Sequence, residues 1–324
     1  MNRRFALIQA LVSLVALAAV VWWASHQDKP HIPTDGDAIA WLAAGIGLYV
    51  VATLVRAERW HQILEHTGVR TKRVDCYALT TVGYMGNNVL PARAGEALRV
   101  VLLSPRCDAS KRTIISSIVA ERLLDVIVLL TFFVVTVYGV LSTSEVLPTD
   151  RPLLVTGIGI SLVIAGAITV WIMRQHHVFE RVRDWLRPLA DAPRALLARW
   201  GLVLLAGTFL LWTIEASVYW SVARAIDMDI SMSGALYLVA LTNFVAALPA
   251  APGSIGTFDA AVAWGAGKLG AAGSVAVSYV ILIRFVLYVP ITVVGLIVLV
   301  TRYGGWSRLR SATREGARLE ASRA

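Results

Sequence analysis

The sequence has few charged residues and few cysteines. Asp, Glu, Lys and Arg make up 16% of its 324 residues, whereas soluble globular proteins contain about 25%. Its two cysteines, Cys76 and Cys107, do not have the Cys/His spacing of a metal site. Both lie in segments that we place on or near the cytoplasmic side, where disulfides are rare. We therefore expect no disulfide, no bound metal and no cofactor.

The sequence also lacks the usual signatures of an enzyme. It contains no Ser/His/Asp order, no pair of metal-binding histidines and no phosphate-binding Gly-Lys loop. The triplet Asp227-Met228-Asp229 matches an Asp-x-Asp motif of sugar-nucleotide enzymes, but so short a match often arises by chance. We expect that the chain is not an enzyme. A membrane-embedded transferase acting on a lipid-linked substrate remains the alternative.

Apolar residues are abundant, at 57% of the sequence with a mean hydropathy of +0.67. They form long runs, which excludes disorder, a disulfide-rich secreted domain and a soluble coiled coil. Runs of about 20 apolar residues match the hydrocarbon thickness of a bilayer. The sequence therefore predicts an all-α polytopic membrane protein with about six full spans. These are Phe5–Ala24, Ala38–Val55, Ile114–Leu141, Leu153–Met173, Leu202–Ala223 and Val275–Thr301.

Two further apolar stretches are interrupted by Gly and Pro. They cover residues 75–104, broken at 87–95, and residues 234–268, broken at 248–256. Each half is too short to cross a bilayer at about 1.5 Å per residue. We therefore predict two re-entrant helical hairpins, since irregular backbone at membrane depth is tolerated where protein or a water-filled cavity surrounds it.

The basic residues predict the orientation. Most Lys and Arg fall on one side when the N-terminus is inside and each hairpin returns to its own side. Because such an excess marks the cytoplasm, we expect residues 1–301 to form one transmembrane domain with both termini cytoplasmic, and residues 302–324 to form a basic tail. Topology and anionic headgroups then account for the net charge of +9, and no nucleic-acid partner is expected.

The two hairpins also predict an inverted repeat. The pattern Leu-Pro-Ala-x-x-Gly occurs at 90–95 and again at 248–253. Each hairpin has a predicted span before and after it, which gives repeats of about 38–173 and 202–301. Three spans separate the starts of the two units, so the second unit is inverted. Inverted repeats with broken helices are typical of secondary transporters. The alternative is that the breaks are packing kinks in ordinary spans.

Ionisable residues in the apolar stretches are the candidate substrate-binding residues. Each would cost about 2.5–3.5 kcal/mol at the bilayer centre, so most need partners or water. Arg93, Arg99 and a helix N-terminus would make a phosphate cradle, unless Glu96 and Arg99 simply pair to stabilise the hairpin. The full set is Arg93, Glu96, Arg99, Glu121, Arg122, Asp125 and Arg284.

The breaks in the hairpins are predicted to act as gates. Their Gly and Pro residues leave backbone groups unpaired, and in the second hairpin these groups either bind headgroup oxygens or only gate. The gate residues are Asn88, Pro91 and Gly95 in the first hairpin, and Pro249, Pro252, Gly253, Gly256 and Asp259 in the second.

Three motifs, in this order, resemble those of a known family. They are Asn88-x-x-Pro91-x-Arg93-x-Gly95-Glu96-x-x-Arg99, Glu121-Arg122-x-x-Asp125, and the run from Leu248 to Asp259. From Ala38 to Thr301 the chain resembles the flippase-like membrane domain of lysylphosphatidylglycerol synthases and its stand-alone relatives, uncharacterised protein family 0104. The resemblance implies movement of a lipid between leaflets. We do not expect the soluble aminoacyl-transferase domain of the synthases, and Asp259 stands where the family often has Glu.

The sequence thus predicts a lipid flippase that moves an anionic phospholipid or a polyprenyl-phosphate-type lipid between the leaflets of the bacterial inner membrane. The expected partners are a lipid with an anionic headgroup, a second copy of the chain in a homo-oligomer, and a lipid-modifying enzyme encoded separately. An ion channel is a further alternative. Breaks lined by Leu, Pro and Ala suit a larger amphiphile better.

Overall fold

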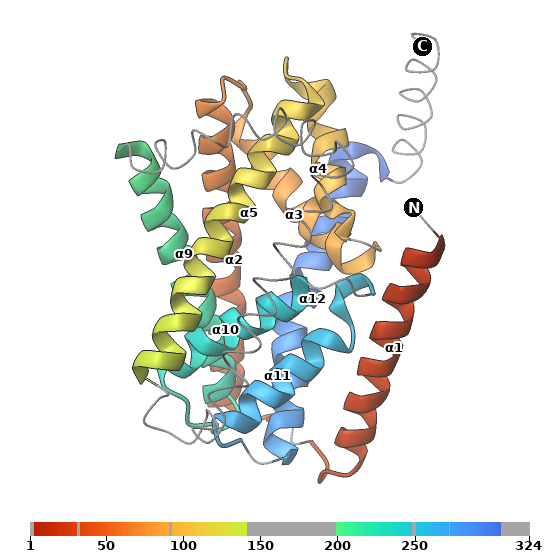
Figure 1. Ribbon diagram of the computed structural model, residues 1–324, viewed down its shortest axis with the longest axis vertical. Helices are drawn as coiled ribbons and strands as arrows, with labels where there is room; N and C mark the ends of the chain where they lie inside the picture. Colours follow the sequence, from red (N-terminus) through yellow and green to blue (C-terminus); the bar gives the residue numbers. More distant parts are fainter. Residues whose placement is uncertain are drawn as a thin grey trace, which may run out of the picture. The chain divides into compact units, whose positions relative to one another are not determined.

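The computed structural model describes residues 3–30, 33–90, 93–140, 199–247, 251–271 and 273–305, and every regular element in these ranges is a helix (Figure 1). The chain divides into two units, residues 1–133 with 208–324, and residues 134–207. All contacts discussed below lie within the first unit. The predicted span Leu153–Met173 and most of the predicted tail lie outside the described residues.

The longer helices follow the apolar runs of the sequence. They are α1 (Arg3–Ser25), α2 (Gly36–His66), α3 (Arg73–Val89), α4 (Gly95–Leu103), α5 (Lys111–Val134), α9 (Arg199–Arg224), α10 (Met232–Ala247), α11 (Thr257–Lys268) and α12 (Gly273–Tyr303). Short helical turns follow α4 (η2, Ser104–Arg106) and precede α11 (η5, Pro252–Ser254), and a π-helix follows α5 (η3, Val135–Val140).

Three described helices are long and apolar enough to cross a membrane. These are α2, α9 and α12, with 31, 26 and 31 residues. At about 1.5 Å per residue each exceeds the roughly 30 Å hydrocarbon core. They contain the predicted spans 38–55, 202–223 and 275–301, which confirms a helical membrane protein. Many of their large apolar side chains are exposed, as expected for residues that face lipid.

The end of α2 differs from the prediction. The second span was expected to stop at Val55, before the first arginine, whereas α2 continues to His66. Arg56 and Arg59 are only 2% and 4% exposed, so they are not loop residues. A prediction from hydropathy ends a span at its first charged residues. In the structure, carboxylates from other helices neutralise Arg56 and Arg59, so the helix continues past them.

The first interrupted stretch forms two antiparallel helices, α3 and α4, in close contact. A Cβ atom added at Gly86 would lie 2.7 Å from the Cα of Gly95, and one at Gly83 would lie 2.7 Å from Cδ of Arg99. The pairings run in opposite directions along the two helices. The small residues therefore allow α4 to lie directly against α3 and bury Arg99.

The second interrupted stretch has the same organisation. A Cβ at Gly265 of α11 would lie 2.6 Å from Cδ2 of Leu238 in α10, and one at Gly234 would lie 3.2 Å from Cδ1 of Leu269, so α10 and α11 are also antiparallel. The chain between them turns at Gly253 and Gly256, with φ values of +64° and +85°. Such angles favour glycine. Both helix pairs therefore form at the predicted positions.

The last helix, α12, runs beside both hairpins (Figure 1). Against α3 the approach is close, because a Cβ at Gly295 would lie 2.8 Å from the carbonyl oxygen of Thr81. The same helix contacts α11 and α2. It therefore provides a common support for the breaks of both hairpins.

Candidate functional site

The two hairpin breaks are in contact with each other. A Cβ at Gly253, in the second break, would lie 3.2 Å from the carbonyl oxygen of Asn88 and 3.4 Å from Cε1 of Tyr288. Asn88 also donates from Nδ2 to Oγ1 of Thr292 in α12, at 2.9 Å. Residues far apart in the sequence thus meet at one place, beside α12.

Arg93 lies in the first break and has no neutralising partner among the residues that the structure describes. Its side chain is exposed, and its φ of +53° is unusual for a residue other than glycine. Within the same ranges, no carboxylate forms an ion pair with it. Arg93 therefore places a guanidinium without a carboxylate partner in the described ranges near the N-terminus of α4, which begins at Gly95. Pro91 lies outside the described residues.

The predicted phosphate ligand Arg99 is already paired. Its Nη2 lies 2.8 Å from Oε2 of Glu121 in α5, and its guanidinium carbon lies 3.9 Å from the ring centroid of Trp60 in α2. Arg99 is 2% exposed and Glu121 is fully buried. This arrangement joins α4 to α5 and α2, and leaves Arg99 little freedom to reach a lipid.

A second arginine, Arg59 of α2, joins the same carboxylates. Its Nη1 lies 2.8 Å from Oδ1 of Asp125 and donates to Oγ1 of Thr208 at 2.9 Å, while its Nη2 lies 3.5 Å from Oε1 of Glu121. The indole of Trp212 also donates to Oδ1 of Asp125, at 3.1 Å. The side chains of Asp125 and Arg59 thus connect α5, α2 and α9.

Arg122 connects the buried carboxylates to the surface. It lies 3.1 Å from Glu96, 3.4 Å from Glu121 and 3.2 Å from Asp125. The side chains of Arg122 and Glu96 are both 32% exposed. Together the six residues form what we call the central ion network: Arg59, Glu96, Arg99, Glu121, Arg122 and Asp125. Its formal charges balance, which satisfies the need for partners in an apolar environment.

Another buried pair was not anticipated from the sequence. Arg56 of α2 pairs with Glu215 of α9, and its guanidinium lies 5.3 Å from the ring centroid of Tyr84 and 5.0 Å from that of Trp212. Arg56 and Arg59 had been placed in a cytoplasmic loop. The available signal was that they are one helical turn apart, followed by the apolar residues Trp60, Ile63 and Leu64.

At the second break, Asp259 holds both the backbone and Arg284. Its Oδ2 accepts from the backbone N–H of Gly256 at 2.9 Å, and its Oδ1 lies 2.5 Å from Nε of Arg284. Arg284 also donates from Nη1 to the carbonyl of Gly253 at 3.2 Å. Its Nη2 is buried and has no hydrogen-bond partner among the described residues.

Arg284 of α12 is therefore bound to the second break, and it pairs with Asp259 of α11 rather than with Glu121 or Asp125 of α5. Pro252 begins the helical turn η5 at this break, and Pro249 lies outside the described residues. In the part of the chain that the structure describes, Arg93 has no carboxylate partner and Nη2 of Arg284 has no hydrogen-bond acceptor, so the two breaks hold donors that a ligand could use.

No three His, Cys, Asp or Glu residues within the described ranges are grouped so that they could hold a metal ion. Asp227 and Asp229 of the Asp-x-Asp triplet lie in the turn between α9 and α10.

Residues 7–295 match the family described as lysylphosphatidylglycerol synthase TM region. The chain belongs to this family. The match covers most of the chain, and it confirms the resemblance that was drawn from the three motifs. Of those motifs, the first contains Arg93, Glu96 and Arg99, the second contains the two buried carboxylates of the central ion network, Glu121 and Asp125, and the third contains Gly253 of the second break.

Individual relatives are distant. A UPF0104 membrane protein of Methanothermobacter thermautotrophicus is 23% identical over 279 residues, which are 78% of this chain and 82% of that protein. Another, from Pyrococcus horikoshii, is 26% identical over 133 residues, 40% of this chain and 39% of the relative. Glycosyltransferase AglD of Haloferax volcanii is 23% identical over 308 residues, and the match covers 80% of this chain and 48% of AglD. This family member thus spans about half the length of AglD.

Proposed function

We propose that this protein is a lipid flippase that moves a lipid with an anionic headgroup between the leaflets of the cell inner membrane. The observation that carries the proposal is the contact between the two hairpin breaks at Asn88 and Gly253, inside a helical membrane protein. An anionic phospholipid or a polyprenyl-phosphate-type lipid has the required phosphate. A separately encoded enzyme would modify or supply that lipid.

The proposed architecture has about six spans and two re-entrant hairpins in an inverted repeat, with both termini cytoplasmic. The first hairpin enters from the cytoplasm and the second from the outside. In carriers of this kind, broken helices meet near the midplane, and two similar halves of opposite orientation expose one site to each side in turn. The antiparallel pairs α3–α4 and α10–α11 are the elements that would exchange between the two states.

At the site, Arg93 would bind the lipid phosphate, and Nη2 of Arg284 would donate a second hydrogen bond from α12. A guanidinium is well suited to a phosphate, because it donates two parallel hydrogen bonds. Arg99 was expected to share this role, but it is paired with Glu121. We therefore assign Arg99 to holding the first hairpin in place, and we assign the half-exposed pair Arg122–Glu96 to keeping the adjacent path polar.

The proposal is tested by following a fluorescent phosphatidylglycerol in proteoliposomes that contain the purified protein. Arg93→Ala should slow its movement between leaflets by about tenfold or more, because the charge-assisted hydrogen bonds from the guanidinium to the phosphate are lost. Arg93→Lys should restore the rate only in part, because Lys keeps the charge but loses the fork. Arg224→Ala is the matched control, because it removes an exposed arginine that is the last residue of α9 and belongs to neither hairpin.

An unchanged rate in well-folded Arg93→Ala protein would overturn the assignment of Arg93. Absence of lipid movement in the wild-type protein would overturn the flippase proposal itself. A membrane-embedded transferase, in contrast, would consume a lipid-linked sugar donor in the same vesicles.

A further inference from the structure

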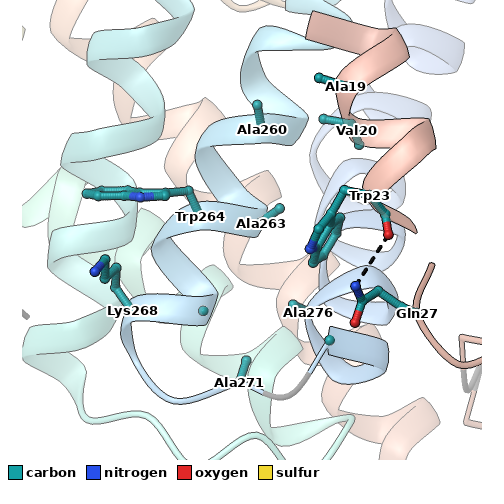
Figure 2. A pocket seen from close by; sticks show the side chains of 12 residues that line it. Ala19, Val20, Trp23, Gln27, Ala260, Ala263, Trp264, Lys268, Ala271 and Ala276 are labelled. Atoms are coloured by element: carbon teal, nitrogen blue, oxygen red, sulfur yellow. Dashed lines mark hydrogen bonds between the residues drawn. The ribbon is translucent and has the colours of Figure 1, made fainter. Parts of the chain in front are cut away.

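A cavity of about 600 Å³ lies between α1 and α11, and none of the residues of the two breaks lines it. Figure 2 shows α11 on one side, with Ala260 and Ala263, and α1 on the other, with Val20 and Trp23. The lining contains Lys268 and Gln27 but no carboxylate. This mainly apolar space, which we call the α1–α11 groove, therefore has a cation at one end.

The opposite end of the groove is closed by direct contact between α1 and the second break. The backbone N–H of Ala251 donates to Oγ of Ser13 at 2.6 Å, and a Cβ at Gly256 would lie 2.7 Å from the carbonyl oxygen of Ser13. From this contact the helices continue to Trp23 and Lys268 with the cavity between them. The groove thus leads from Lys268, at the end of α11, toward the break that Arg284 contacts.

The length and charge of the groove fit one kind of occupant. The 12 residues of α11 rise about 18 Å, and one leaflet of the hydrocarbon core is about 15 Å thick. An acyl chain of one leaflet therefore matches α11 in length. The Lys268 ammonium lies 5.9 Å from the ring centroid of Trp264, whose side chain is 54% exposed. Lys and Trp together at the end of an apolar helix are typical of the headgroup level.

We propose that the α1–α11 groove binds one anionic phospholipid, with an acyl chain along Ala260 and Ala263 and its phosphate at Lys268. The role of this site in transport rests on the proposed flippase function. The site adds where the lipid is held, on the side of the membrane that Lys268 faces. The binding itself is measurable without transport.

Gly267 allows the groove to be filled without disturbing the protein. It lines the groove, and a Cβ added there meets no atom within 4 Å. Gly267→Leu therefore places a side chain in the lipid's space, and leucine favours a helix more than glycine does. Gly47→Leu in α2 is the matched control, because that glycine is also exposed, helical and free of neighbours within 4 Å.

The experiment is native mass spectrometry of the purified protein with added phosphatidylglycerol or phosphatidylcholine. All variants carry Arg93→Ala, so that a lipid at the two breaks contributes less to the adduct. Gly267→Leu should remove the retained phosphatidylglycerol adduct, and Gly47→Leu should keep it. Lys268→Glu should lower the occupancy of phosphatidylglycerol about fivefold or more, because a lysine near an anionic headgroup is lost. Phosphatidylcholine should respond less, and Arg224→Glu should change neither lipid.

An unchanged phosphatidylglycerol adduct in Gly267→Leu protein would overturn the proposal that the α1–α11 groove binds lipid, even if the wild-type protein moves lipid. A loss of dimer in that variant, with the lipid adduct retained, would also overturn it, because the groove would then hold a second copy of the chain. If the variants lose the adduct while wild-type protein moves no lipid, the groove stands and the flippase proposal fails.

Discussion

At the residue scale, the buried charges of this protein are held by partners from other helices. Glu121 is fully buried, yet Arg99, Arg59 and Arg122 all approach it. Taking these ions out of water is costly, and only close pairing offsets that cost. The network therefore stabilises the arrangement of α2, α4 and α5 only while both signs are present.

Glu121→Gln should accordingly destabilise the protein, by about 3–5 kcal/mol, since it leaves Arg99 without its carboxylate. The measurement is thermal unfolding in detergent, followed by the loss of the monodisperse peak in size-exclusion chromatography. Glu58→Gln is the control, because Glu58 is half-buried and pairs at 3.5 Å with the exposed Arg73. Equal melting temperatures for the two variants would contradict the structural role of the network.

At the element scale, the hairpins depend on glycine for close contact and for reversal of the chain. Gly83, Gly86 and Gly95 bring α3 and α4 together, while Gly253 and Gly256 adopt positive φ in the second break. Whether each hairpin returns to the side from which it entered is a prediction that labelling can test.

In a protein without its native cysteines, Lys72→Cys and Ser110→Cys flank the first hairpin, while Ser231→Cys and Lys268→Cys flank the second. We expect the first pair to react with a membrane-impermeant maleimide only after permeabilisation, and the second pair to react in intact cells. Opposite labelling within either pair would make that hairpin a full crossing. In the protein that still has its native cysteines, Cys107 should react slowly with the maleimide, because burial raises the pKa of its thiol. Replacing Cys107 should therefore lower the background labelling only a little.

The sequence predicted the positions of these elements better than their partners. Gly and Pro act locally, so the breaks at residues 87–95 and 248–256 could be located from composition and length alone. Ion pairing depends on contacts between distant segments, such as Arg59 with Asp125 or Arg56 with Glu215. For this reason the sequence assigned Arg99 to the lipid and Arg56 to a loop, and it considered pairing Glu96 with Arg99, whereas each of these residues pairs with another helix.

At the scale of the first unit, α12 connects the two hairpins. It receives the hydrogen bond of Asn88 at Thr292 and provides Arg284 to the second break. If the hairpins move in alternation, at least one of these contacts must break and re-form during each transport cycle. We expect the contact between Asn88 and Thr292 to be the one that breaks, so a covalent link there should stop the cycle without unfolding the protein.

The test is an Asn88→Cys/Thr292→Cys protein in which the native Cys76 and Cys107 are replaced, treated with a short, cleavable bifunctional thiol reagent. The native side chains approach to 2.9 Å, so the introduced thiols should lie within reach of the reagent. We expect cross-linking to abolish phosphatidylglycerol movement in proteoliposomes, and reduction to restore it. Each single-cysteine variant receives the same treatment, which separates the effect of the link from that of the modification. Full transport by the cross-linked protein would mean that α3 and α12 stay together throughout the cycle, and the moving boundary would then lie between Gly253 and Asn88.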